Sequence, residues 1–167
     1  MNRTWTVSES IVVDVDPLAV YSVISNPTRT AEWSPENTGA AVEDPRPEAY
    51  VGMAFDGTNR RGPFRWVTRC YVTDAEPGSR FRFEVRRWGV GKPLLKVPVA
   101  SWDFQLEPVA NGTKITETWT DDRRNWPDLL CRVVDPLLTS QPSFADFNRR
   151  NIQTSLRRLK RQLESDS

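Results

Sequence analysis

The C-terminal part of this 167-residue sequence constrains the fold more than any other. Residues at the spacing of one helical face are Phe144, Phe147, Asn151, Ile152, Ser155, Leu156, Leu159 and Leu163. Ser143, with Asp146 three residues later, resembles a capping box, and Pro142 at the first helical position is an alternative start. A helix of roughly 22 residues, rising about 1.5 Å per residue, is on the order of 30 Å long and spans a small domain.

Before this helix, apolar and polar residues alternate in the pattern of half-buried strands. We expect a first strand over residues 4–15, and later strands over 53–59, 64–72, 80–88, 99–109 and 113–121. Turn-forming residues separate these segments. Asn111-Gly112 predicts a two-residue hairpin turn of the primed type, which pairs the last two strands antiparallel. The pattern therefore indicates a curved antiparallel sheet of about seven strands.

Two short helices are predicted directly after the first strand. Asp16 and Pro17 supply an N-cap and a proline at the first helical position, and Ser25-Asn26-Pro27 ends this helix. A second short helix is expected from Pro27 to Trp33. A sheet with one apolar face needs a cover, and only the C-terminal helix is long enough to provide it.

The predicted fold is therefore α+β, with the curved sheet closing around the long helix. A chain of this length has the size of one ordinary domain, so we expect a single domain over residues 1–167, with residues 164–167 frayed. We also expect a cytoplasmic protein, because no apolar run has the length of a signal peptide or a transmembrane helix.

The composition excludes several classes of function. The formal net charge is +1, so no global field favours nucleic acid or an acidic membrane. We interpret the basic residues on the other side of the C-terminal helix as a solvated surface and expect no nucleic-acid partner. They are Arg149, Arg150, Arg157, Arg158, Lys160 and Arg161.

The sequence contains no histidine, which excludes Ser-His and Cys-His nucleophilic catalysis and histidine-ligated metal sites. The two cysteines, Cys70 and Cys131, have neither the number nor the spacing of a disulfide framework or a metal cluster. We therefore expect no metal and no cofactor. Any acid–base chemistry falls to Glu, Asp, Lys, Tyr or a bound water.

Several short motifs, taken in order, resemble one known family. They are Asp16-Pro17-Leu18-Ala19-Val20-Tyr21, Ile24-Ser25-Asn26-Pro27, Glu32-Trp33-Ser34-Pro35, Val51-Gly52-Met53-Ala54-Phe55 with Gly57, Glu76-Pro77-Gly78, Trp102 to Thr116, and Leu156-Arg157-Arg158-Leu159-Lys160. The chain is similar to the START-like or SRPBCC superfamily, and within it to the polyketide cyclase/dehydrase and lipid-transport group. The resemblance covers nearly the whole chain.

This resemblance implies a helix-grip fold of the START/Bet v 1-like type. It also implies a scaffold that encloses ligands such as aromatic polyketides, sterols, phospholipids, quinones and plant hormones. Members of the superfamily include cyclases, carriers and proteins without an assigned activity, so the resemblance does not fix a reaction.

The concave face of the predicted sheet should collect the inward residues of the central strands, facing the long helix. The expected cavity residues are Phe55, Asn59, Trp66, Thr68, Cys70, Phe83, Trp102, Phe104, Trp119, Phe147, Asn151 and Ile152. Large aromatic side chains suit planar or lipidic ligands, although each of them is also a normal core residue. As a set they favour a partly open pocket.

Glu117 lies between Ile115 and Trp119 on the predicted inner face, where desolvation raises the pKa of a carboxyl. It is the candidate catalytic acid or base, and its alternatives are an outward orientation or neutralisation by an arginine. Glu9 carries a weaker form of the same argument. The side chains of Asn59, Thr68 and Asn151 are candidate hydrogen-bond donors to a ligand, whereas Cys70 is interpreted as a small buried hydrophobe.

The segment from Trp126 to Leu138 has apolar residues at helical spacing between the last strand and the final helix. We interpret it as a short helix across the cavity mouth, with Trp126, Leu130 and Val134 as lid residues. A dimer contact and peripheral membrane docking are the alternatives, since an exposed apolar stripe is adhesive. Trp88, Leu94 and Leu95 are expected to border the same opening.

Three functions follow from these features. The first is binding of a hydrophobic small molecule, such as a lipid, polyketide or quinone-like compound, by a monomeric or homodimeric carrier or sensor. The second is a cyclase or dehydratase that uses the inward carboxylate of Glu117. The third is an interaction protein that docks a macromolecule through the apolar stripe at 126–138 or the basic helix face.

Overall fold

The structure is a computed structural model that describes residues 3–166, and its seven strands form one antiparallel sheet. The strands lie in the order β1-β7-β6-β5-β4-β3-β2. Their bounds are β1 Thr6–Val13, β2 Asn37–Val42, β3 Ala54–Arg61, β4 Phe64–Glu76, β5 Arg80–Gly89, β6 Leu95–Val109 and β7 Gly112–Asp121. The predicted curved antiparallel sheet is confirmed.

Four helical elements complete the fold. They are α1 Pro17–Ile24, the 3-10 helix η1 Pro27–Glu32, α2 Asp128–Thr139 and α3 Phe144–Ser165. As predicted, two short helices follow the first strand. The Asp16 carboxylate accepts hydrogen bonds from the backbone N–H groups of Leu18 and Ala19, so the predicted N-cap is present. The second helix begins at Pro27 but winds more tightly than an α-helix.

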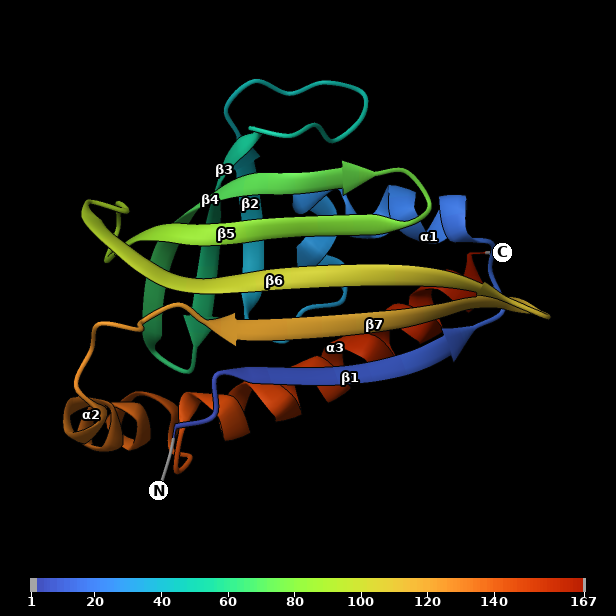
Figure 1. The fold of residues 1–167 in the computed structure, drawn as a ribbon. Coiled ribbons are helices and arrows are strands. Elements are labelled where there is room, and N and C mark those ends of the chain that lie inside the picture. Colours follow the sequence, from blue (N-terminus) through green and yellow to red (C-terminus); the bar gives the residue numbers. More distant parts are fainter. Residues whose placement is uncertain (1–2, 167) are drawn as a thin grey trace.

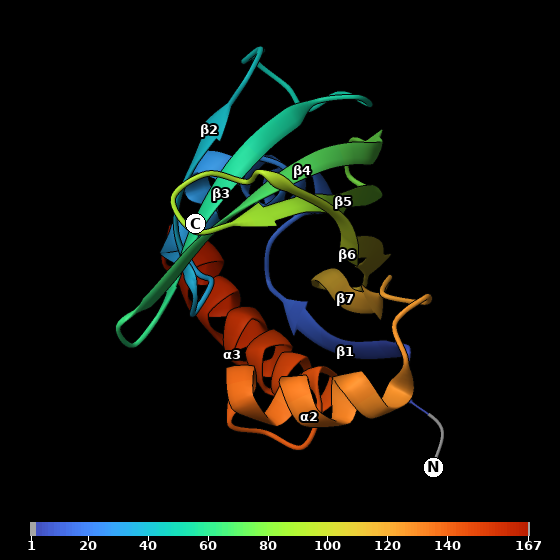
Figure 2. The same ribbon diagram turned by 90° about the vertical axis from the view of Figure 1, so that its left-hand side faces the viewer.

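Helix α3 closes the open side of the curved sheet (Figures 1 and 2). Ser143 is its N-cap, because the Ser143 hydroxyl accepts from the Asp146 backbone N–H at 3.2 Å. The alternative start at Pro142 is thereby excluded. The helix continues to Ser165 through part of the segment expected to fray, and position 167 lies outside the described residues.

The hydrophobic core lies between the concave face of the sheet and α3, and it extends beneath α1. Its large, fully buried members are Ile24, Phe81, Ile115, Ile152 and Leu159. They come from four different elements, α1, β5, β7 and α3. The core therefore ties α1 and α3 to the central strands and leaves the remaining concave surface to a cavity.

The β6–β7 hairpin forms, but the predicted primed turn at Asn111-Gly112 is wrong. Val109 pairs with Gly112, so Ala110 and Asn111 form the loop. A primed turn of type I′ needs a positive φ at both loop positions, and within residues 3–166 the only non-glycine residue with positive φ is Ser140. Gly112 is required for a different reason, since a Cβ there would lie 1.9 Å from the carbonyl oxygen of Val13.

Strand β2 is the one strand whose range was not predicted. Its sequence, NTGAAV, lacks a clear alternation of large apolar and polar side chains. It pairs only with β3 and forms the edge of the sheet, where burial imposes little pattern. The chain enters β2 from η1 through Trp33 to Glu36, and this connection contributes to the site described next.

Candidate functional site

A cavity of about 410 Å³, partly open to solvent, lies between the concave face of the sheet and α3. Its volume falls within the range of about 300–1,000 Å³ that is typical of small-molecule sites. All the predicted cavity residues except Ile152 line it: Phe55, Asn59, Trp66, Thr68, Cys70, Phe83, Trp102, Phe104, Trp119, Phe147 and Asn151. Ile152 is instead fully buried in the core on α3.

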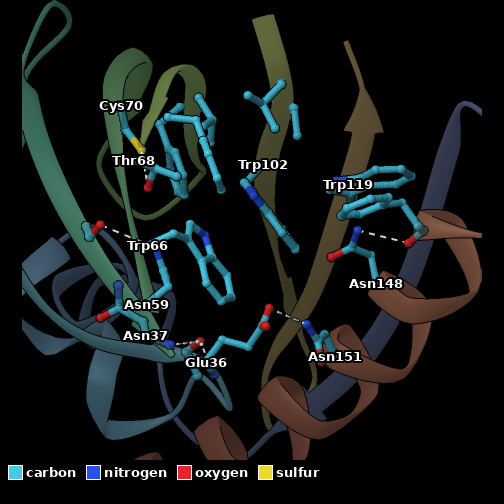
Figure 3. A pocket seen from close by; sticks show the side chains of 18 of the residues that line it. Glu36, Asn37, Asn59, Trp66, Thr68, Cys70, Trp102, Trp119, Asn148 and Asn151 are labelled. Carbon is cyan, nitrogen blue, oxygen red and sulfur yellow. Dashed lines mark hydrogen bonds between the residues drawn. The ribbon is translucent and has the colours of Figure 1, made fainter. Parts of the chain in front are cut away.

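Aromatic rings form most of the cavity wall. Trp66, Trp102 and Trp119 point into the same space from β4, β6 and β7 (Figure 3). Phe55 and Phe83 pack edge to face, with ring centroids 5.3 Å apart, so their rings hold each other in place. The cavity is therefore a preformed space with rigid apolar walls.

The three residues expected to border the opening lie around the connection between β5 and β6. Trp88 and Leu95 line the cavity, whereas Leu94 lies exposed outside it. The ring of Phe64 stacks between those of Trp66 and Trp88, at centroid distances of 5.4 and 6.4 Å. Phe64, at the start of β4, thus connects Trp66 on the same strand to Trp88 near the end of β5.

A polar cluster at Glu36 was not predicted from the sequence. The Asn151 amide donates to Glu36 Oε1 at 2.9 Å, and Arg61 donates to Glu36 Oε2 at 2.7 and 2.9 Å (Figure 3 shows the first bond). Burial raises the pKa of the Glu36 carboxyl, while Arg61 and Asn151 oppose that rise. All three residues line the cavity, so its polar groups are mutually paired here.

Arg61 also connects the wall to α2. Its guanidinium donates a hydrogen bond to the backbone carbonyl of Leu138, near the C-terminal end of that helix. It lies 4.0 Å from the ring centroid of Phe147 and 5.2 Å from that of Trp66. Leu138 itself lines the cavity, so Arg61 fixes one edge of the mouth.

Glu117 lines the cavity and is only 2% exposed. Its Oε2 atom is buried without a hydrogen-bond partner among residues 3–166. Burial holds the pKa of the Glu117 carboxyl well above the usual range of a glutamate. Burial thus favours the protonated form of this carboxyl, which donates a hydrogen bond as well as accepting one.

Glu9 pairs with Glu117 across the β1–β7 ladder but does not line the cavity. Its carboxylate faces α3, where it accepts from the Gln153 amide at 3.3 Å and lies 3.7 Å from the Arg149 guanidinium. Glu9 therefore has partners on the helix, in contrast to Glu117.

The other predicted polar residues have local partners. The Asn59 amide donates to the Gly57 carbonyl at 3.3 Å, and the Cys70 thiol donates to the Thr68 hydroxyl at 3.8 Å. Burial raises the pKa of the Cys70 thiol to about 12, which removes the thiolate a nucleophile needs. Cys70 is thus a small apolar part of the wall.

A buried ion-pair network anchors α2 to the end of β7. The Arg123 guanidinium lies 2.9 Å from both Asp121 and Asp135, and all three side chains are almost fully buried. Asp135 also accepts from the backbone N–H of Phe144 at 3.2 Å, at the first residue of α3. Arg123 lines the cavity as well, so this network joins β7, α2 and α3 beside the mouth.

The predicted helix at 126–138 is present as α2, but its apolar stripe faces outward. Its buried residues are Cys131, Asp135 and Thr139. Its exposed large apolar residues are Leu129, Leu130, Val133, Leu137 and Leu138. Of the predicted lid residues, Trp126 and Val134 line the cavity, whereas Leu130 does not. The ion pair of Asp135 with Arg123 determines this orientation, because the buried carboxylate has to face its cation.

Metal-ligating clusters and membrane-spanning helices are both absent from the described residues. Residues 3–166 contain no group of three or more His, Cys, Asp or Glu side chains placed to hold a metal ion. Over the same residues, no helix is both long and apolar enough to span a membrane.

The sequence matches one family model, described as polyketide cyclase/dehydrase and lipid transport, over residues 4–164. No curated protein matches the chain. Since that model covers most of the chain, its match concerns the whole fold, including the cavity and α3.

Solved structures with a similar fold come from bacteria and plants. A START superfamily protein from Mycobacterium smegmatis aligns with a TM-score of 0.70 and 11% identity, covering 98% of this chain and all (100%) of that one. A Polyketide_cyc-like protein, Cgl2372 from Corynebacterium glutamicum, aligns with a TM-score of 0.55 and 24% identity, covering 98% and 91%.

The major latex-like protein 151 of Panax ginseng aligns with a TM-score of 0.62 and 9% identity, covering 94% of this chain and 95% of that one. At these identities the likeness concerns the fold alone.

Proposed function

The chain belongs to the polyketide cyclase/dehydrase and lipid-transport family, and from this premise we propose that it binds a hydrophobic small molecule in its internal cavity. The ligand would be a lipid, a polyketide or a quinone-like compound, and the protein would act as its carrier or sensor. A shared fold does not determine what is bound, so the support has to come from the cavity itself.

The observation that carries the proposal is a cavity of about 410 Å³ with mostly aromatic walls, in which the polar side chains of Glu36, Arg61 and Asn151 are paired with each other. Burial of apolar ligand surface there contributes about 25 cal/mol per Å². Most of the wall residues come from strands and helices, so binding has to order few protein groups. This preformed space supports binding of an apolar molecule with modest polar character.

Helix α2 is the part of the boundary best suited to admit the ligand. Val134 and Leu138 line the cavity, and one hydrogen bond from Arg61 holds the C-terminal end of the helix to the wall. The buried pair of Arg123 and Asp135 holds the same half of the helix, about one turn before Leu138. Opening of the mouth would therefore involve the turn that follows Asp135, beyond the buried ion pair.

A cyclase or dehydratase activity is the second candidate, and the state of Glu117 favours it. A carboxyl with a raised pKa can transfer a proton to or from a bound substrate near neutral pH. The cavity would then fold a polyketide-like chain so that the reacting carbons meet. If Glu117→Gln left the rate and the product distribution unchanged on an accepted substrate, this candidate would fail.

Native mass spectrometry of freshly purified protein tests the binding proposal. We expect a retained ligand, or uptake of at least one compound from a panel of fatty acids, phospholipids, aromatic polyketides and quinones. The bound mass should dissociate in the gas phase as an intact small molecule. A protein that retains nothing and takes up no compound of the panel would contradict the proposal.

A further inference from the structure

Two polar groups in the cavity wall have no partner within the described chain. One is Glu117 Oε2 on β7, and the other is the indole Nε1–H of Trp33, which follows η1. Both residues line the cavity, and both side chains are buried, with exposed fractions of 2% and 4%. An unmade hydrogen bond of this kind costs roughly 1–3 kcal/mol, so two in one cavity call for an explanation.

Phe104 is a neighbour of both residues. Its ring packs edge to face against that of Trp33, with centroids 5.7 Å apart. Phe104 also lies directly opposite Glu117 in the β6–β7 ladder, and such cross-strand neighbours project from the same face of a sheet. Trp33 and Glu117 therefore flank one residue on the concave side.

The chemistry of the two groups restricts what can satisfy them. An indole N–H only donates, so its partner has to be an acceptor. Burial favours the protonated form of the Glu117 carboxyl, and a protonated carboxyl donates through its O–H. Two buried donors on residues that both neighbour Phe104 match an acceptor oxygen, whereas an ammonium group would meet the indole donor with another donor.

The charges around the cavity argue against an anionic ligand group at this place. Among the described residues that line the cavity, the cations are Arg61 and Arg123. Arg61 is paired with Glu36, and Arg123 is paired with Asp121 and Asp135. A carboxylate or phosphate next to Glu117 would thus lack a free cation among the described lining residues.

We propose that Trp33 and Glu117 form a recognition site for the carbonyl oxygen of an otherwise apolar ligand. The oxygen would accept one hydrogen bond from the indole N–H and one from the carboxyl O–H. This inference deepens the binding function proposed above and rests on it, because it names the ligand class: a neutral ketone, quinone or ester. The same two bonds would polarise the carbonyl of a substrate if the protein acts on one.

The test uses the fluorescent naphthyl ketone prodan and its deoxy analogue, in which a methylene replaces the carbonyl. Both are apolar and nearly equal in shape, so their affinities differ through the carbonyl. Dissociation constants are measured by fluorescence titration for the wild type, Trp33→Phe and Glu117→Met. In each variant the ketone should bind roughly three- to tenfold more weakly, and the deoxy analogue should bind as before or more tightly.

Glu117→Gln serves as the matched control, because the glutamine amide also donates a hydrogen bond while it keeps the shape. It should retain most of the affinity for prodan. An infrared spectrum of prodan bound to the wild-type protein provides a measurement that needs no variant. Its carbonyl stretch should lie at the lower frequency of a hydrogen-bonded ketone.

The outcomes separate this inference from the function on which it rests. If both probes bind but neither substitution distinguishes them, or if the bound carbonyl stretches as it does in an alkane, carbonyl recognition is overturned while hydrophobic binding stands. If neither probe binds and the panel compounds fail as well, both proposals are overturned. Selective loss of the ketone in both variants supports both.

Discussion

Asn151 on α3 donates a 2.9 Å hydrogen bond to Glu36, which lies just before β2, and thereby joins the gripping helix to the far edge of the sheet. Arg61 on β3 binds the same carboxylate and also reaches the carbonyl of Leu138 at the end of α2. The Glu36 carboxylate thus connects α3 to the edge of the sheet. Through Arg61 it is also connected to the border of the cavity mouth.

The first prediction concerns the attachment of α2. Arg61→Met keeps much of the aliphatic stem but removes the guanidinium donors to Glu36 and Leu138, so the C-terminal end of α2 should move more freely. We expect faster release of bound prodan in stopped-flow displacement, with a smaller change in its equilibrium affinity. The control is Arg60→Met, because Arg60 is exposed and its guanidinium donates to the nearby Gly62 carbonyl rather than to Glu36 or Leu138. Equal release rates in the two variants would show that Arg61 does not hold the mouth.

The second prediction concerns the buried network. Arg123→Met leaves Asp121 and Asp135 buried without their shared cation, and loss of one partner of a buried ion pair costs about 3 kcal/mol or more. The free energy of unfolding from urea denaturation should fall by that amount. Arg124→Met is the matched control, since the Arg124 side chain is exposed and its loss should change the free energy of unfolding little. A loss below about 1 kcal/mol in Arg123→Met would contradict the anchoring role.

The third prediction follows from the raised pKa of Glu117. The folded protein holds this proton above the pH at which an unfolded glutamate has lost it, so stability falls as pH rises from the usual glutamate pKa toward the raised one. Within that window one proton changes the free energy of unfolding by up to about 1.4 kcal/mol per pH unit. Glu117→Gln cannot ionise and should show a flatter dependence.

The measurement for this third prediction is urea denaturation of both proteins at several pH values above 5. The pKa of Glu36 is also raised, but that contribution is common to both proteins and cancels in the difference. The variant should gain stability relative to the wild type as pH increases. Parallel curves would mean that Glu117 titrates normally.

The fourth prediction separates the two sides of α2. Leu129 and Leu137 are exposed on its outer side, whereas Val134 lines the cavity. Val134→Asp should weaken binding of the deoxy probe, because it places an unpaired carboxylate against an apolar ligand. The pair Leu129→Asp and Leu137→Asp should leave that affinity unchanged. The opposite ranking would reverse the assignment of the inner side.

Periodicity alone predicted most of the fold. Alternation in β4 to β7 and helical spacing in α3 each reflect one buried face, and burial imposes a pattern that a sequence records. The cavity walls followed for the same reason, because Trp66, Trp102 and Trp119 occupy inward positions of predicted strands. The sequence also placed Glu117 on the concave face through its position between Ile115 and Trp119.

The parts that could not be predicted depend on contacts between distant residues. Glu36 and Arg61 lie 25 positions apart beside loops, where no periodic pattern marks a buried carboxylate or its cation. The amphipathic pattern of α2 predicted that its apolar stripe faces the cavity. The structure turns that stripe outward, because the Asp135 carboxylate lies on the other side of the helix and pairs with Arg123. The periodic pattern predicted that α2 exists. The ion pair between Asp135 and Arg123 determined which side of α2 faces the protein.

The central claim is that the cavity is a binding site rather than a packing defect, and filling it tests this most directly. Thr68 lines the cavity on β4, whereas the adjacent Val67 projects from the opposite face of the same strand. Thr68→Trp should weaken prodan binding by roughly tenfold or more, while Val67→Trp, which introduces the same side chain on the other face, should bind like the wild type. Equal dissociation constants for the two tryptophan variants would contradict the account.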